Sequence, residues 1–397
     1  MQKPNPFYNY TIIGAGASGL WMAYALYKHG LLKDKTLVIV EQDTQKFNDR
    51  TWCYWAKEEL SPQQLADKVW HYSLNAEATS KSGSIFPYSY YHIRSKDFYQ
   101  KIKNLLVRCE NISWLYTSFK SYEDATDVMV KTKQASWKTS KLFLSALTDG
   151  EDAFSSQQLK SYLNNSDKQH ILMWQSFVGW RVKTLKPVFN SSRMTLMDFD
   201  IPQNGQTQFL YELPFSDTES LVEITRFGEE KLNPTAAEAL LKDYLAARNT
   251  PYEITETEVG AIPMTTHFDS KRKTLHKNEN IIFLGTLAGA IKPTTGYGFK
   301  RMAKYADDVA KAMATHAALP TTYRPWRFRL YDTILLQILV SQPQRGKEIF
   351  QTLFKKQPTP RILKFLDEET SIKEEVMIFS KLPILLFLKS LIRYFTK

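Results

Sequence analysis

Cysteine is scarce in this chain, and long hydrophobic runs are missing. Only Cys53 and Cys109 occur among 397 residues, which excludes a disulfide framework and a zinc-finger cluster and favours a reducing compartment. Because no run of about 18 uninterrupted apolar residues is present, we expect no membrane-spanning helix. The first residues, MQKPNPFYNYTI, lack the basic and apolar regions of a signal peptide, which favours a cytoplasmic protein.

Acidic residues are outnumbered by basic ones, 41 to 52, and the net charge is +11. Such an excess suits nucleic acid, an anionic membrane surface or an anionic ligand. The positive charge is dispersed and no nucleic-acid-reading motif is present, so we reject nucleic acid as a partner. Metal-ligand spacings and a G-x-S-x-G nucleophile motif are also missing. The 23 Phe, 21 Tyr and 9 Trp favour a greasy or planar ligand, or a membrane surface.

A dinucleotide-binding pattern opens the chain. Residues 8–13 are apolar and β-branched, as in a buried strand, and GAGASG (residues 14–19) follows directly. A helix is expected over residues 20–29, and a second buried strand over 36–40 leads to Glu41. Gly14 permits the tight turn, Gly16 lets the backbone approach a pyrophosphate and Gly19 allows close helix packing, with Ala17 and Ser18 between them. The phosphates would lie at the helix N-terminus, and Glu41 would hold ribose hydroxyls.

A second glycine cluster lies late in the chain and favours FAD over NAD. A strand over residues 281–284 runs into Gly285, Thr286 and Gly289, and then into Thr295, Gly296 and Tyr297 before a helix over about 298–316. The two clusters hold seven of the 15 glycines, which indicates a shared role of the backbone towards a ligand. Two-domain flavoproteins bind FAD through this kind of discontinuous domain. Many of them have Gly-Asp where this chain has Gly285-Thr286.

The middle of the chain changes pattern. Short strands are expected over residues 194–199, 209–213 and 220–225, with a hairpin turn at Asn204-Gly205 and a helix over about 235–248. The predicted fold is therefore α/β: a Rossmann-like FAD-binding domain of the glutathione-reductase type, an inserted antiparallel-sheet substrate domain and a helical C-terminal region. We assign residues 1–60 and 255–318, with part of 90–180, to the first, residues 61–89 and 181–254 to the second, and residues 319–397 to the third.

The last residues, 381–397, contain four cations and no acid. On a helix these cations fall on one side and leave the rest apolar, which suits a helix lying on an anionic membrane surface. The alternative is a helix that packs on its own domain. The surface interpretation predicts a cytoplasmic protein bound peripherally to the inner face of the cell membrane.

Several short motifs follow one another in a fixed order. They are NDRTWC (48–53), FVGW (177–180), MDF (197–199), YELPFS (211–216), LVEIT (221–225), GAIP (260–263) and KPTTGY (292–297). In this order and at these spacings, from about Tyr8 to Met302, the chain resembles the bacterial lycopene β-cyclases of carotenoid synthesis. Two departures are KLFLSA (141–146), where the family often has an acidic-Arg or Asn-Ser motif, and VEI (222–224), which keeps one acid of a two-acid motif.

The resemblance implies an isomerase that acts without net oxidation or reduction. The terminal C1=C2 bond of lycopene is protonated, the chain closes into a six-membered ring, and loss of a proton gives a β-ring. FAD in its reduced form is the implied cofactor, with NAD(P)H as its reductant, and linear carotenes are the implied substrates. The family's essential glutamate matches Glu223, which we predict to be the acid/base. A carboxylic acid in an apolar tunnel stays protonated near neutral pH, as protonation of an alkene requires.

The motifs supply further candidates. Asp49 is predicted to contact flavin or support the acid, or else to be a turn residue bonded to its own backbone. Arg50 and Thr51 are candidate flavin contacts, and Asp198 is a candidate accessory acid. The candidate aromatic residues of the tunnel, which core packing explains equally well, are Trp52, Trp55, Trp180 and Tyr211.

Two rival functions remain open at this point. One keeps the flavin and changes the chemistry to an FAD-dependent hydroxylase, epoxidase or reductase of a lipid. The other is a flavin-containing carotenoid-binding protein without catalysis, in which Glu223 would be dispensable. The sequence does not decide the oligomeric state or whether one or both ends of the substrate are cyclised.

Overall fold

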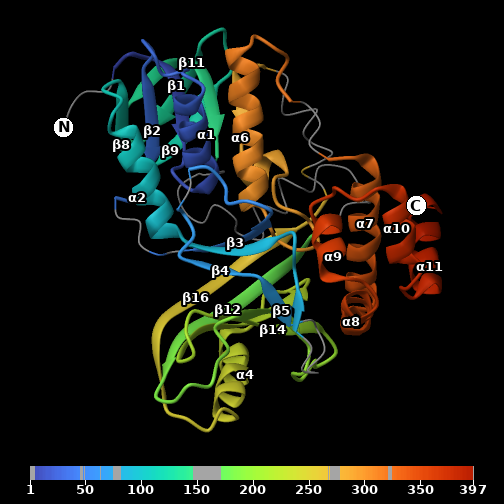
Figure 1. The fold of residues 1–397 in the computed structure, drawn as a ribbon. Coiled ribbons are helices and arrows are strands. Elements are labelled where there is room, and N and C mark those ends of the chain that lie inside the picture. The colour runs from blue at the N-terminus through green and yellow to red at the C-terminus, as the bar shows by residue number, and fades with distance from the viewer. Residues whose placement is uncertain are drawn as a thin grey trace.

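A computed structural model describes residues 5–44, 48, 50–62, 64–74, 82–145, 171–266, 268, 278–320 and 324–396. In this part of the chain, three sheets and a C-terminal group of helices make up the molecule (Figure 1). The predicted α/β class, with a Rossmann-like unit, an antiparallel sheet and a helical C-terminal region, is confirmed.

The first sheet has a parallel core that begins with the first strand of the chain. Its parallel strands are β1 (Phe7–Ile13), β2 (Leu37–Glu41), β8 (Ile112–Tyr116), β11 (Ser136–Leu144) and β17 (Ile281–Phe283). Two antiparallel strands, β9 (Phe119–Glu123) and β10 (Val128–Thr132), extend it beyond β11. Strand β17 comes from the late glycine cluster, so the two ends of the predicted flavin-binding unit meet in one sheet.

Three helices pack on one face of this sheet: α1 (Ala17–Lys28), α2 (Ser95–Leu106) and α6 (Phe299–Ala314). Ile12 and Ile39 of the sheet share a buried cluster with Leu26 of α1 and Val309 of α6. In Figure 1, α1 and α6 run side by side beside the strands. The predicted strand–helix–strand unit at the N-terminus is confirmed, with α1 starting three residues earlier than expected.

The second sheet is predominantly antiparallel. Its strands, in spatial order, are β16 (Tyr252–Met264), β12 (Met173–Thr184), β15 (Glu219–Gly228), β14 (Thr207–Pro214), β13 (Arg193–Asp198), β5 (Tyr72–Leu74) and β6 (Ser82–Ser84). The predicted hairpin joins β13 and β14, and both Asn204 (φ 49°) and Gly205 (φ 74°) adopt the left-handed conformation that such a turn requires.

Helix α4 (Pro234–Ala246) covers one face of the second sheet. Asn233 caps it by accepting a hydrogen bond from the Ala236 N–H, and Pro234 occupies its first turn. Val178, Trp180 and Ile224 of the sheet pack with helical Leu241. The opposite face therefore points away from α4, towards the rest of the molecule (Figure 1).

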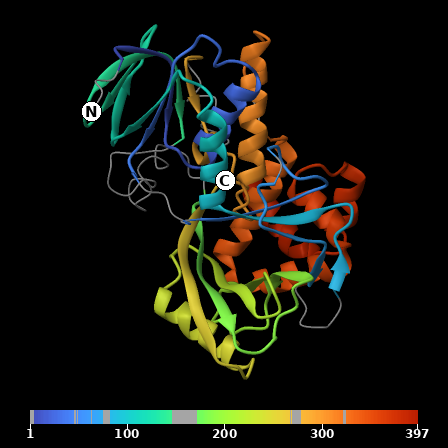
Figure 2. The same cartoon turned by 60° about the vertical axis from the view of Figure 1, so that its left-hand side comes forward.

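A small third sheet and the C-terminal helices complete the fold. The sheet has the order β3 (Thr51–Ala56), β7 (Ser89–Arg94) and β4 (Lys68–Trp70). The helices are α7 (Trp326–Ser341), α8 (Gly346–Lys356), α9 (Thr359–Leu366), α10 (Ile372–Phe379) and α11 (Ile384–Thr396), and short 3-10 turns lie at Gly285–Ala288 and Pro343–Arg345. Figure 2 shows the C-terminal helices gathered beside the second sheet.

The division into domains stays a prediction. Its boundaries at 180/181 and 254/255 fall inside β12 and β16, the two longest strands of the second sheet. Among the described residues, every helix is too short or too polar to cross a bilayer.

Candidate functional site

A cavity of about 350 Å³ lies over the face of the second sheet that α4 leaves open. The residues of β3, the KPTTGY loop and helices α8 and α9 form its other walls. Its lining is mostly apolar and aromatic, and includes Trp52, Trp55, Phe177, Phe209 and Phe350. Such a lining suits an elongated apolar ligand and keeps water away from polar groups in the wall.

Glu223 lies in the sheet wall of this cavity. Its direct cross-strand neighbours are Tyr211 on β14 and Gly179 on β12, and Gly179 in turn pairs with Glu258 on β16. Directly paired residues point to the same side of a sheet, so these four positions form one row across the cavity wall. Three of them, Tyr211, Glu223 and Glu258, line the cavity itself.

The surroundings of Glu223 favour its neutral form. Part of its surface faces the cavity, and the surrounding protein removes it from bulk water. Burial and the nearby charge of Glu258 raise its pKa to about 8, and a hydrogen bond of 2.7 Å from the Thr225 hydroxyl to Oε1 opposes them only partly. A carboxyl group with this pKa holds its proton at neutral pH and can act as a general acid.

Glu258 is a site residue that the sequence analysis missed. It lies in the segment YEITETEVG, which has three acids among nine residues and looks like a solvent-exposed strand. Burial raises its pKa, while hydrogen bonds from Thr51 and the charges of Arg50 and His92 oppose that rise. The Thr51 N–H lies 3.2 Å from Oε1 of Glu258. Only the strand register of the folded sheet shows that Glu258 pairs with Gly179 and so lies in the cavity wall.

A cluster of hydroxyl groups and a thiol lies at one end of the same row. The Tyr90 hydroxyl hydrogen-bonds to those of Tyr211 and Tyr297, the latter at 2.7 Å. Burial raises the pKa of the Cys53 thiol to about 12 and those of Tyr90 and Tyr211 well above their ordinary value. These groups are uncharged near neutral pH and offer oriented dipoles to the cavity.

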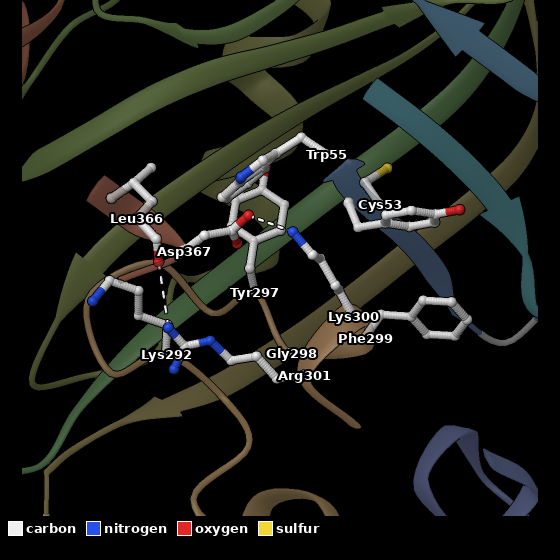
Figure 3. Close-up of a pocket in the computed structure, with 11 residues that line it drawn as sticks. Cys53, Trp55, Lys292, Tyr297, Gly298, Phe299, Lys300, Arg301, Leu366 and Asp367 are labelled. Atoms are coloured by element: carbon white, nitrogen blue, oxygen red, sulfur yellow. Dashed lines mark hydrogen bonds and ion pairs between the residues drawn. The ribbon is translucent and has the colours of Figure 1, made fainter. Parts of the chain in front are cut away.

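A smaller pocket lies beside Tyr297, at the end of the late glycine loop (residues 285–297). Figure 3 shows Trp55 and Tyr297 next to the pair formed by Lys300 and Asp367, whose Nζ and Oδ2 atoms are 2.5 Å apart. This pair joins the start of α6 to the end of α9.

The early glycine loop has the geometry of a dinucleotide site. Gly14 has φ 90°, and a Cβ at Gly19 would lie 1.9 Å from the Gly14 carbonyl oxygen, so neither position accepts a side chain without rearrangement. At Gly16 no atom of the described part of the chain lies within 4 Å of an added Cβ. Among the described residues no side chain caps the start of helix α1, which leaves its first N–H groups available to an anion.

Glu41 lies at the end of β2, as predicted, and its carboxylate contacts the loop. Oε2 accepts a hydrogen bond of 2.7 Å from the Ala15 N–H. The carboxylate is thus held beside the glycine turn, where a ribose would follow the phosphates of a dinucleotide.

The late glycine loop packs directly on the early one. A Cβ at Gly285 would lie 2.4 Å from Ser18 Oγ, and Gly285 has φ 59°. Further along, Gly296 has φ 74° and closely approaches the Gln175 side chain. Thr286 lies in the 3-10 turn that ends at left-handed Gly289.

Two buried polar atoms at the late loop have no hydrogen-bond partner among the described residues. They are Thr295 Oγ1 and Gln175 Oε1, and both residues line the large cavity. Buried polar atoms normally have partners, so these two favour a ligand with polar groups between the glycine loops and the cavity. The residues present therefore fit a dinucleotide cofactor whose other end reaches the cavity.

The remaining predicted residues fall into three groups. Arg50 and Thr51 line the cavity, and Thr51 bonds to Glu258. Asp198 lies outside the cavity lining: it pairs with Leu210, whose side chain belongs to the cluster under α4, and burial raises its pKa. Asp49 lies outside the described residues.

Of the four aromatic residues predicted to line a tunnel, three line the cavity and one does not. Trp52, Trp55 and Tyr211 line the cavity. Trp180 packs on the opposite face of the sheet, with α4, because it follows Gly179 by one residue and side chains alternate along a strand.

Comparison with known proteins places these features in a family. A family model described as "Lycopene cyclase protein" matches residues 10–392. The chain is 30% identical over 138 residues to the lycopene beta-cyclase of Paracoccus sp. (strain N81106 / MBIC 01143), covering 34% of this chain and 36% of that protein. It is 25% identical over 219 residues to that of Pantoea ananas, covering 53% and 56%. To that of Pseudescherichia vulneris it is 23% identical over 392 residues, covering 94% and 93%.

The chain thus spans only about a third and about half of the first two relatives, and nearly all of the third.

Solved structures share the fold at low sequence identity. A geranylgeranyl bacteriochlorophyll reductase-like protein from Thermoplasma acidophilum aligns with a TM-score of 0.56 and 10% identity, over 98% of this chain and 99% of that one. The flavin-dependent monooxygenase PieE, in complex with FAD and substrate, aligns with a TM-score of 0.57 and 10% identity, over 99% and 72%.

Proposed function

Because the chain belongs to the lycopene cyclase family, we propose that it is a lycopene β-cyclase, which closes the linear ψ-ends of lycopene into β-ionone rings without net oxidation or reduction. The observation that carries the proposal is Glu223, a carboxyl group in the wall of an apolar cavity with its pKa raised to about 8. Protonation of an alkene needs a neutral acid held away from water, and this position supplies both conditions.

The proposed chemistry balances in protons. The Glu223 carboxyl gives its proton to C2 of the C1=C2 bond, the electron pair of that bond forms the new C–H bond, and the positive charge lies on C1. C1 then accepts the electron pair of the C5=C6 bond, which forms the C1–C6 bond, closes the ring and moves the positive charge to C5. A proton then leaves C6, so that a β-ring forms and one proton is gained for each proton lost.

The cavity wall suits the cation as well as the acid. Trp52, Trp55 and Tyr211 line the same cavity as Glu223, and aromatic faces attract positive charge. The mostly apolar lining of the cavity would keep water from capturing the cation as an alcohol.

FAD is the proposed cofactor. Gly14, Gly16 and Gly19, with Ala17 and Ser18 at the start of α1, would hold the pyrophosphate, and Glu41 would hold the ribose. The late loop, from Gly285 and Thr286 to Gly289 and from Thr295 to Tyr297, would border the isoalloxazine ring, together with Arg50 and Thr51. In its reduced form, with NAD(P)H as the source of electrons, the flavin would supply negative charge next to the cation.

A peripheral position on the inner face of the cell membrane belongs to the same proposal. Helix α11 packs through Leu386 and Ser390, while its outer side shows large apolar residues to solvent, with Leu385 75% and Phe395 72% exposed. The neighbouring α10 adds Ile372 and Val376. Such a surface, with Lys389 and Arg393 nearby, suits an anionic bilayer that holds the carotene substrate.

The experiment is an anaerobic assay of the purified protein with lycopene in liposomes and chemically reduced FAD. The products are separated by chromatography, and their masses are measured by mass spectrometry. We expect γ- and β-carotene of unchanged mass, formed only with reduced flavin and abolished by Glu223→Gln. A product that gains oxygen or hydrogen would instead indicate a lipid hydroxylase, epoxidase or reductase. Bound carotene without any product would indicate a binding protein.

A further inference from the structure

Two carboxyl groups face each other across one glycine in the wall of the cavity. Glu223 and Glu258 are both paired with Gly179, from opposite sides, in the row described above. We propose that Glu258 is a positioning residue for Glu223: the two carboxyls hold one proton between them, Glu258 is the ionised member, and it passes protons from a polar pocket to Glu223. This inference rests on the proposed cyclase function.

The missing side chain at Gly179 brings the two acids together. A Cβ at this position would lie 3.4 Å from the Cβ, Cγ and Oε2 atoms of Glu223, so the glutamate leans over the glycine. Oε1 of Glu223 accepts the Thr225 hydroxyl, which leaves Oε2 as the oxygen on the Gly179 side. Glu258 lies on the other side of Gly179, on β16, and its charge acts on Glu223. Two carboxyl groups that interact in an apolar wall do not both ionise readily, because each charge opposes the other.

The surroundings of Glu258 stabilise a negative charge better than those of Glu223 do. Burial raises the pKa of Glu258 too, but Glu258 accepts the Thr51 N–H at 3.2 Å, and the charges of Arg50 and His92 oppose that rise. Glu223 has the Thr225 hydroxyl as its hydrogen-bond donor and receives the charge of Glu258. The charge therefore belongs on Glu258 and the proton on Glu223, which is the arrangement that an acid needs before the substrate is protonated.

Glu258 also lines a second, more polar pocket on its other side. This pocket is small and includes Asn48, His92, Arg181 and Glu256. Glu258 belongs to the lining of both the apolar cavity and this pocket, whereas Glu223 lines only the former. A proton can thus reach Glu223 through Glu258 without a path for water across the apolar cavity.

The other ionisable groups around the pair do not compete for this role. Tyr211 and Tyr297 keep their protons, because burial raises their pKa far above the neutral range, and burial raises that of Cys53 to about 12. On the side of Glu258 the facing charged groups are Arg50, Arg181, His92, Asp67 and Glu256; Arg181 is bound to Glu219 at 2.6 Å, and His92 to Asp67 at 2.5 Å.

The pair accounts for the proton in each catalytic cycle. Glu223 loses its proton to the alkene and the pair becomes doubly ionised. The repulsion between the two carboxylates is offset by the neighbouring cation, and it ends when the proton from C6 returns to the pair. The exchange restores the singly protonated pair, and no oxidant or reductant is consumed.

The test is the pH dependence of ring formation with reduced FAD in wild type and Glu258→Gln. Removing the charge of Glu258 lowers the pKa of Glu223, so we expect the alkaline limb of the profile to move to lower pH by about one unit. Glu258→Asp keeps the charge and should restore the limb towards its wild-type position. Glu253→Gln removes the same charge from an exposed site on the same strand and should leave the profile unchanged.

A second measurement does not depend on turnover. Infrared spectroscopy of the folded protein in the absence of substrate follows the carbonyl band of a protonated carboxyl group, identified by its loss in Glu223→Gln. We expect this band to titrate at lower pH in Glu258→Gln than in wild type.

The outcomes separate the inference from the proposed function. A wild-type protein that forms no ring at any pH would contradict the cyclase proposal, and the infrared titration would still test the pair. Ring formation by Glu258→Gln with an unmoved alkaline limb, or a Glu223 band that titrates as in wild type, would overturn the inference. A uniform loss of rate at every pH would assign Glu258 a purely structural role and would overturn it as well.

Discussion

Lys292 Nζ lies 3.0 Å from Asp332 Oδ1, and both side chains are almost completely buried. Lys292 begins the KPTTGY loop, and Asp332 belongs to α7. Glu368, which follows α9, lies 3.1 Å from the same ammonium group. Arg324 forms ion pairs with both acids, and Arg301 forms one with Glu368. The loop that borders the proposed flavin site is thereby held to the C-terminal helices that form the far wall of the cavity.

Breaking this cluster is expected to destabilise the fold strongly. Asp332→Asn leaves Lys292 and Arg324 short of a partner in the interior, and removal of one member of a buried pair costs about 3–5 kcal/mol. Urea denaturation followed by circular dichroism measures the loss. The control is Asp308→Asn, which breaks an exposed pair with Lys304 and should cost less than about 1 kcal/mol. Equal small losses in the two variants would contradict the assigned role.

Gly16→Val separates ligand binding from folding. An added Cβ at Gly16 meets open space, so we expect its free energy of unfolding to change by less than about 1 kcal/mol in the absence of ligand. The side chain would occupy the place of the pyrophosphate, so the protein should be purified without most of its flavin colour. Gly19→Ala is different, because its Cβ would meet the Gly14 oxygen. It should lower the free energy of unfolding by about 1–3 kcal/mol. Full flavin occupancy in Gly16→Val would contradict the dinucleotide site.

The sequence alone predicted the elements that local pattern determines. The glycine loop between β1 and α1, Glu41 at the end of β2 and the Asn204-Gly205 hairpin all depend on residues close together in the chain. Trp180 is different: whether it faces the cavity or α4 depends on the register of β12, which its own sequence does not fix.

The residues that the sequence did not reveal depend on contacts across the fold. Glu258 became a candidate only when β16 was aligned with β12 and β15. Tyr90 joins Tyr211 and Tyr297 from a strand that carries no motif of its own. The residues Phe365–Thr370 look like a motif with two acids, but Glu368 and Asp367 hold cations of other elements.

The raised pKa of Glu223 predicts a pH dependence of stability. The folded protein keeps this carboxyl protonated up to about pH 8, whereas the unfolded chain ionises it near the ordinary value of 4.5. The stability associated with the proton is therefore complete below pH 4.5 and is lost as the pH rises towards 8. Glu223→Gln lacks this carboxyl group and therefore this loss. As the pH rises from 4.5 to 8, the free energy of unfolding of Glu223→Gln should rise by about 3–5 kcal/mol relative to that of wild type. Denaturation at a series of pH values measures it, and a constant difference would show that Glu223 is not held neutral.

The outer side of α11 is predicted to bind anionic membranes. Leu385→Glu and Phe395→Glu place charge where apolar side chains would enter the bilayer, and each should weaken co-sedimentation with anionic liposomes about tenfold or more. Leu185→Glu is the matched control, because Leu185 is 77% exposed and lies outside the C-terminal helices, directly after β12. If all three variants sediment as wild type does, α11 is an ordinary packed helix.

The most direct test of Glu223 as the acid is cyclisation of lycopene in D2O with reduced FAD. The proton on Glu223 exchanges with solvent, so we expect every ring formed to carry one deuterium on C2, with hydrogen lost from C6. Glu223→Gln should form no ring, and Glu253→Gln should label as wild type does. Rings formed without deuterium, or labelled rings from Glu223→Gln, would contradict protonation by Glu223.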